Sequence, residues 1–133
     1  MNLYRTHVNS TVHATGGQFG AGIGAGYDTH CNGQNYTAVN EIVITGESTI
    51  IAQGGKYAAG IGTGYHSAYL SGSIAEGVIV NATAGESREK YTIAQNIGYG
   101  VVDSTREFWG ENAKVTFTVA GKVIEPPKAV KQN

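Results

Sequence analysis

The stretch GIGAGY at residues 22–27 returns as GIGTGY at residues 60–65. When the alignment is extended, residues 10–27 match residues 48–65 at 11 of 18 positions, with a constant offset of 38 residues. Self-similarity at a fixed period of about 20–50 residues is typical of architectures built from repeated structural units. The sequence therefore predicts a repeat protein.

A third, degenerate copy follows the first two. Residues 96–100 (NIGYG) match residues 60–64 at an offset of 36, and a polar insertion at residues 85–91 precedes them. Between the glycine motifs lie three strand-like triplets, 36 and 37 residues apart, at residues 42–44, 78–80 and 115–117. We therefore expect one domain, residues 1–125, built from about three units of 36–38 residues, and a C-terminal tail at residues 126–133.

The alternating glycines do not fit a nucleotide-binding loop. A dinucleotide fingerprint has the spacing G-x-G-x-x-G and lies between a strand and a helix. Here the spacing is G-x-G-x-G, and a turn-rich segment without helical periodicity follows at residues 27–33. Gly-Lys-Ser and Gly-Lys-Thr, the end of a P-loop, are also missing from the chain.

A structural interpretation explains the glycines better. Residues of a strand alternate between its two faces, so Gly-Ile-Gly directs the isoleucine inward and lets neighbouring backbone approach closely. The sequence predicts an all-β fold, a short parallel β-helix, with about two coils of roughly 20 residues in each unit. Two interior columns are expected: one of Ile23, Ile61 and Ile97, and one of Ile44, Val80 and Phe117.

The motifs GAGIGAGY and AAGIGTGY, each preceded by ATGG or AQGG, resemble a known family of repeats. They are similar to the Gly-Ala-Gly-Ile-Gly tandem repeats of bacterial and protist cell-surface proteins, across roughly residues 8–122. The third copy departs from the pattern, since Asn96 replaces a glycine and Val101 a tyrosine. The resemblance implies a right-handed β-helix, an extracellular or cell-surface location, and a role in display, adhesion or ligand binding.

Composition excludes several classes of protein. The net charge of −1 leaves no basic surface for nucleic acid, and no apolar run is long enough for a transmembrane helix. No signal peptide is visible at the N-terminus. Cys31 is the single cysteine, and Cys31 with His30 lacks the further ligands of a metal site. We expect no metal and no cofactor.

Two tyrosines recur at equivalent positions, each followed by a polar residue. Aromatic rings beside polar groups are typical of sugar-binding surfaces. The candidate binding residues are Tyr27, Asp28, Tyr65 and His66. A structural role, in which the tyrosines close each unit, is the alternative. The first functional hypothesis is a non-enzymatic module for binding or display, with carbohydrate as the ligand.

Two other functions stay open. Glu41, Glu76 and Glu111 are 35 residues apart, which suggests either a carboxylate row or recurring surface residues. With cations from the irregular segments, such a row would suit a lyase or hydrolase acting on polysaccharides. Those cations are Arg88, Lys90 and Arg106. The third option is a structural stalk that forms homo-oligomers through its open strand edges.

Overall fold

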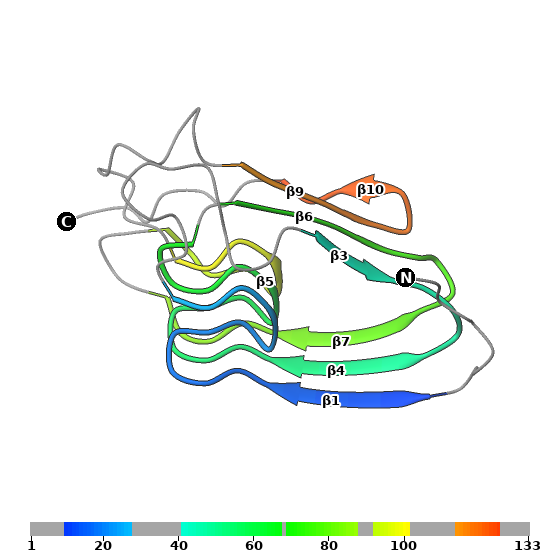
Figure 1. The fold of residues 1–133 in the computed structure, drawn as a ribbon, viewed down its shortest axis with the longest axis horizontal. Helices are drawn as coiled ribbons and strands as arrows, with labels where there is room; N and C mark the ends of the chain where they lie inside the picture. Colours follow the sequence, from blue (N-terminus) through cyan, green and yellow to red (C-terminus); the bar gives the residue numbers. More distant parts are fainter. Residues whose placement is uncertain (1–9, 28–40, 68, 88–91, 102–113, 126–133) are drawn as a thin grey trace.

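The computed structural model describes residues 10–27, 41–67, 69–87, 92–101 and 114–125. This part of the chain is all-β, with strands in three sheets (Figure 1). The first sheet, the β4 sheet, has the order β1–β4–β7 and contains β1 (Thr11–Thr15), β4 (Thr49–Gln53) and β7 (Ile79–Thr83).

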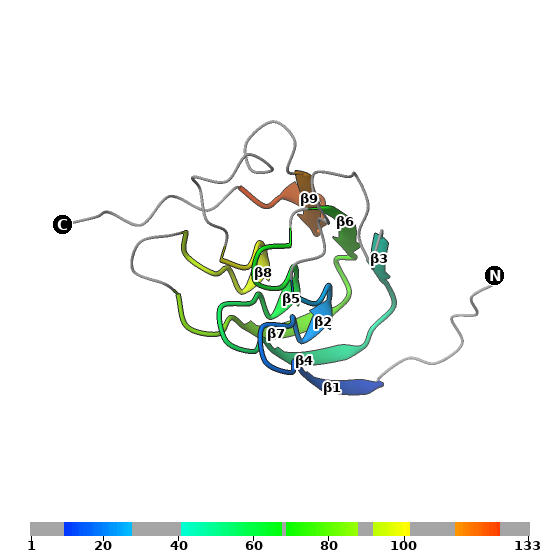
Figure 2. The ribbon, with the colours of Figure 1, turned by 60° about the vertical axis from the view of Figure 1, so that its left-hand side comes forward.

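The second sheet, the β5 sheet, is made of two-residue strands at the glycine motifs: β2 (Ile23–Gly24), β5 (Ile61–Gly62) and β8 (Ile97–Gly98). The third, the β6 sheet, has the order β10–β9–β6–β3. Its strands are β3 (Glu41–Ile44), β6 (Tyr69–Ile74), β9 (Lys114–Val119) and β10 (Lys122–Val123). Figure 2 shows the three sheets surrounding a common interior.

The chain passes through the three sheets in a repeating order. Strands β3, β4 and β5 belong to the β6 sheet, the β4 sheet and the β5 sheet in turn, and strands β6, β7 and β8 follow the same order. Among the strands of the described residues, all pairs are parallel except β9 with β10. Paired residues are 30 positions apart for Thr49 and Ile79, and 45 apart for Leu70 and Val115. Neighbouring strands of one sheet are therefore separated by about one unit of sequence, and each unit adds one strand to each sheet. Two coils in each unit would separate them by only about 20 residues, so that expectation is wrong.

The isoleucines of the glycine motifs lie side by side. Ile23 pairs with Ile61, and Ile61 pairs with Ile97. Ile61 is fully buried, and the other two pack against the same core cluster. Each such side chain contributes about 1.5–3 kcal/mol when it is fully removed from water.

The expected second column is wrong. Ile44 and Phe117 both lie in the β6 sheet but at different registers, since Ile44 pairs with Ile74 and Phe117 with Gly72. Val80 belongs to the β4 sheet, where it pairs with Ile50. All three contribute to the same core. The triplet at 42–44 is matched in the sheet by 72–74, Gly-Ser-Ile, which holds too few apolar residues to be recognised as a strand by composition.

The flanking glycines are required by close backbone contact. Gly24, Gly62 and Gly98 have φ values of 136°, 141° and 127°, which L side chains rarely adopt. A Cβ added at Gly60 would lie 2.7 Å from Thr83 N and 2.8 Å from Asn96 O of the next unit. Each of the first two motifs is thus overlaid by the backbone of its successor.

This overlay accounts for Asn96, which stands where the first two units have glycine. It directly precedes β8, which is the last strand of the β5 sheet within the described residues. The side chain is exposed, and its Oδ1 accepts a hydrogen bond from Ala84 N at 2.9 Å. A side chain is therefore accommodated at the end of the sheet, where the earlier units require glycine.

Tyr99 joins the last glycine motif to β9. Its hydroxyl oxygen lies 3.4 Å from Val115 N and 3.5 Å from Val115 O, and the side chain is buried. Burial raises the pKa of this hydroxyl above its ordinary value of 10.0, because the phenolate would lose hydration, while the backbone hydrogen bond to Val115 acts in the opposite direction.

Stability is therefore expected to fall in alkali through Tyr99. Above about pH 10 the unfolded chain releases this proton while the folded protein retains it, so the unfolded state binds fewer protons. The stabilisation is complete below that pH and is lost as the pH rises through the folded pKa. Urea titrations at about pH 9 and at about pH 11 measure how much unfolding free energy is lost between the two pH values. This loss should be smaller for Tyr99→Phe than for the unaltered chain. Equal losses would contradict this assignment.

Candidate functional site

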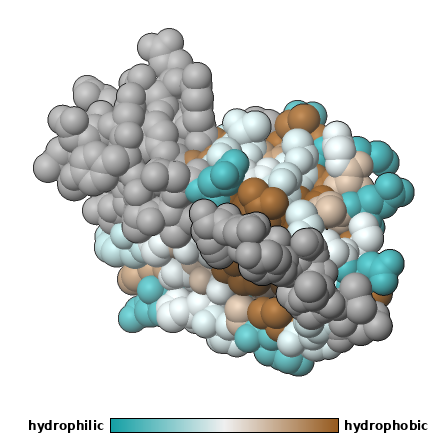
Figure 3. Space-filling view, turned by 45° about the vertical axis from the view of Figure 1, so that its right-hand side comes forward, coloured by the Kyte–Doolittle hydropathy of each residue, from teal (hydrophilic) through white to brown (hydrophobic). Residues whose placement is uncertain are grey.

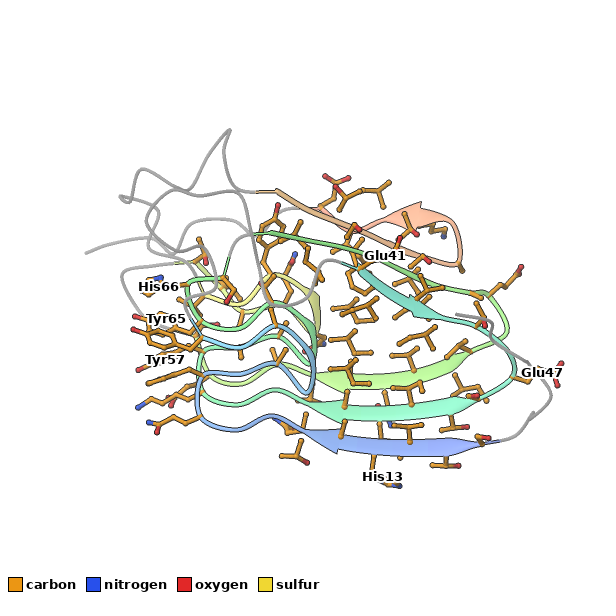
Figure 4. All side chains as sticks on the ribbon, in the orientation of Figure 1. His13, Glu41, Glu47, Tyr57, Tyr65 and His66 are labelled. Atoms are coloured by element: carbon orange, nitrogen blue, oxygen red, sulfur yellow. The ribbon has the colours of Figure 1, made fainter. Side chains whose placement is uncertain are left out.

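Aromatic side chains gather from two kinds of segment: the turns that lead from the β4 sheet to the β5 sheet, and the residues that follow the β5-sheet strands. Five rings form this aromatic cluster: Phe19, Tyr27, Tyr57, Tyr65 and His66. Figure 4 shows the labelled Tyr57, Tyr65 and His66 projecting together from the edge of the molecule formed by the stacked turns. The cluster draws residues from the first two units, so it exists only because those units are adjacent.

Tight turns place two of these rings. Phe19 and Tyr57 follow Gly-Gly-Gln and Gly-Gly-Lys, and each lies in a turn closed by a backbone hydrogen bond, Gly20 N to Gly17 O (3.0 Å) and Ala58 N to Gly55 O (3.1 Å). Both aromatic residues have positive φ, 66° and 63°. Non-glycine residues adopt this conformation at a cost of about 1–3 kcal/mol unless surrounding contacts support it. Ring packing supplies those contacts.

Tyr65 is at the centre of the cluster. Its ring centroid lies 5.5 Å from that of Tyr27, 5.3 Å from that of Phe19 and 5.1 Å from that of Tyr57. The His66 ring is stacked at 3.9 Å with an interplanar angle of 26°. Each aromatic pair contributes about 0.5–1.5 kcal/mol beyond the area it buries. Tyr65 is therefore the structural support of the cluster.

The rings differ in their access to solvent. Tyr27 is 51% exposed, Phe19 and Tyr57 are partly buried, and Tyr65 and His66 are 6% and 3% exposed. Of the four residues proposed from the sequence for ligand binding, Tyr27 is thus on the surface and two are buried. Asp28 lies outside the described residues.

Phe19 and Tyr57 were not among the candidates chosen from the sequence. They occupy the same position in the first two units, and Phe19 stacks on Tyr57 with centroids 5.9 Å apart and an interplanar angle of 15°. Recurrence of an aromatic residue at one position of the repeat was the signal that could have identified them.

Charged groups beside the cluster balance each other. Gln18, Lys56 and Glu86 each follow the last residue of their β4-sheet strand by three positions. Lys56 Nζ lies 5.1 Å from the Tyr57 ring centroid and 3.8 Å from Glu86 Oε1. Both side chains are largely exposed, so this ion pair adds little stability, but it offsets the positive charge of Lys56 beside the Tyr57 ring.

Their spacing in the sequence suggested that Glu41 and Glu76 belong to one row of carboxylates, but the structure does not place them in one row. Glu41 pairs with Ser71 in the β6 sheet, whereas Glu76 lies beyond the end of β6 at Ile74. Glu111 and the cations considered with it lie outside the described residues, as do His30 and Cys31. Within the ranges that the structure describes, no three His, Cys, Asp or Glu residues are grouped as metal ligands.

The rest of the described surface has no comparable cluster of rings. Figure 3 shows apolar residues interspersed among polar ones on the described part of the face it presents. None of the described residues form a helix long and apolar enough to span a membrane. Comparisons of the chain with protein-family models, with curated proteins and with solved structures find no match.

Proposed function

We propose that this chain is a non-enzymatic module for binding and display in a surface or secreted protein, with carbohydrate as its ligand. Its scaffold is a short right-handed parallel β-helix. The ordered passage of the chain through three parallel sheets supports this scaffold, and connections between parallel strands of one sheet are right-handed in about 98% of cases.

The exposed Tyr27, held within a cluster of packed rings, is the observation that carries the proposed function. A sugar ring presents apolar C–H groups on its face and hydroxyls at its edge, so it stacks on an aromatic ring while its hydroxyls remain hydrated. Tyr27 offers half of its surface to solvent, and Phe19, 5.2 Å away between centroids, and the partly exposed Tyr57 extend the aromatic surface.

Binding to an array of cell-wall glycans tests this proposal. The unaltered chain should bind, and Tyr27→Ala should lose most of the signal while the variant stays folded. Loss of the ring pairs with Phe19 and Tyr65 should lower its free energy of unfolding by about 1–3 kcal/mol. Ile79→Ala is the matched control, because Ile79 is also exposed, at 64%, but lies on β7 in the β4 sheet. A blank array for the unaltered chain would refute carbohydrate binding.

A role as an oligomerising stalk is the second candidate. β1 is the edge strand of the β4 sheet, and its Val12 is 42% exposed although it pairs with Ile50, which is 4% exposed. An edge strand with free backbone groups and an exposed apolar side chain can recruit another strand. A blank glycan array together with a concentration-dependent mass in light scattering would favour this function.

A further inference from the structure

We propose, on the basis of the proposed function, that the module binds one glycan per chain, at Tyr27 of the first unit. The glycan is a neutral chain of pyranoses whose substituents are equatorial, such as β-linked glucose, xylose or N-acetylglucosamine. Repetition of the motif suggests several equivalent sites. At the position of Tyr27 in the described units, the three-dimensional arrangement leaves only the first with an exposed ring.

The number of sites follows from exposure at one position of the repeat. Tyr27, Tyr65 and Val101 occupy that position in the three units, and they are 51%, 6% and 0% exposed. Tyr65 is enclosed by Tyr27, Phe19, Tyr57 and His66, and the third unit has no ring there. Of these three positions, only the first can stack a sugar without rearrangement of the cluster.

The neighbouring unit holds Tyr27 in place before a ligand arrives. Its ring lies 5.5 Å from that of Tyr65 at an interplanar angle of 18°. The backbone just before it is bonded to the second unit, since Ala25 N donates to Gly62 O at 2.9 Å and Ser67 Oγ donates to Gly26 O. A ring fixed in this way loses little conformational freedom on binding, which favours affinity for a small ligand.

The class of sugar follows from charge and from ring shape. The four large rings of the cluster carry no charge, and the nearest described cation, Lys56, is paired with Glu86. An acidic polysaccharide would instead require unpaired cations to offset the desolvation of its carboxylates. Equatorial substituents leave only C–H groups on the faces of a pyranose, which suits stacking on a flat tyrosine.

Isothermal titration calorimetry with four hexasaccharides tests the inference. Cellohexaose, xylohexaose and chitohexaose are the neutral probes, and hexagalacturonate is the acidic one. At least one neutral probe should bind with a stoichiometry of one, and hexagalacturonate should not bind. Tyr27→Ala should weaken the neutral interaction at least ten-fold, whereas Tyr27→Trp, which keeps an aromatic face, should stay within about three-fold of the unaltered chain. Lys56→Ala should change the affinity less than two-fold.

The adverse outcomes separate this inference from the proposed function. A stoichiometry of two or more, or unchanged affinity in Tyr27→Ala, overturns the single site while carbohydrate binding stands. Binding of hexagalacturonate alone, lost in Lys56→Ala, overturns the neutral class. Silence of all four probes with a positive glycan array also overturns that class. Silence of the probes with a blank array removes the proposed function as well.

Discussion

Gly62→Ala is expected to cost the chain about 3 kcal/mol or more of unfolding free energy, a large part of the 5–15 kcal/mol typical of a folded domain. Gly62 has a φ of 141°, a conformation that strains any L side chain. A Cβ there would also overlap Gly98 O of the next unit. Both penalties fall on backbone, so no side-chain rotation can relieve them.

Urea unfolding followed by circular dichroism measures this effect. Gly26→Ala is the matched control from the same class of motif, because a Cβ at Gly26 has no atom within 4 Å and its φ lies outside the left-handed region. The control should retain a urea midpoint close to that of the unaltered chain. If the two variants unfold at similar urea concentrations, the close contact between successive glycine motifs does not stabilise the fold as argued.

Ile61→Ala is expected to produce the second large effect, a loss of about 2–5 kcal/mol. Ile61 is fully buried and lies between Ile23 and Ile97 in the β5 sheet. Truncation removes apolar contacts and leaves a cavity that the hydrogen-bonded strands on either side cannot easily close. The shorter truncation Ile61→Val should cost only about 0.5–1.5 kcal/mol.

Ile79→Ala provides the comparison for Ile61→Ala, since it removes the same atoms from a side chain that is 64% exposed on β7. Its effect on the free energy of unfolding should stay within about ±0.5 kcal/mol. Equal losses at the two positions would show that the isoleucines of the glycine motifs do not form the core of this protein.

The local sequence pattern was sufficient to predict the interior column of isoleucines. Ile23 and Ile61 are each flanked by two glycines and recur at one offset, and the structure pairs them directly. The second column could not be predicted in the same way. Residues 72–74 pair with 42–44 despite a Gly-Ser-Ile composition, because Phe117 from the next strand lies over Gly72 and fills the space that a side chain would occupy.

At the candidate site, too, the sequence predicted one property and left another to the tertiary structure. The sequence identified Tyr27 and Tyr65 as equivalent residues, but it could not distinguish the exposed ring from the buried one. Their local motifs are nearly identical, GIGAGY and GIGTGY, so their different exposure comes from the residues packed around each. Phe19 and Tyr57 reach the site through turns of positive φ, which their own side chains disfavour.

By itself, the amino-acid sequence determined the all-β class, the repeated unit and the inward direction of the central isoleucines. These properties depend on the alternation of neighbouring residues along a strand and on the recurrence of short motifs. Only the tertiary structure decided which strands pair, how many each unit contributes, and which tyrosine meets solvent. Those properties depend on contacts between residues 30–45 positions apart, and the lengths of the intervening segments vary from unit to unit.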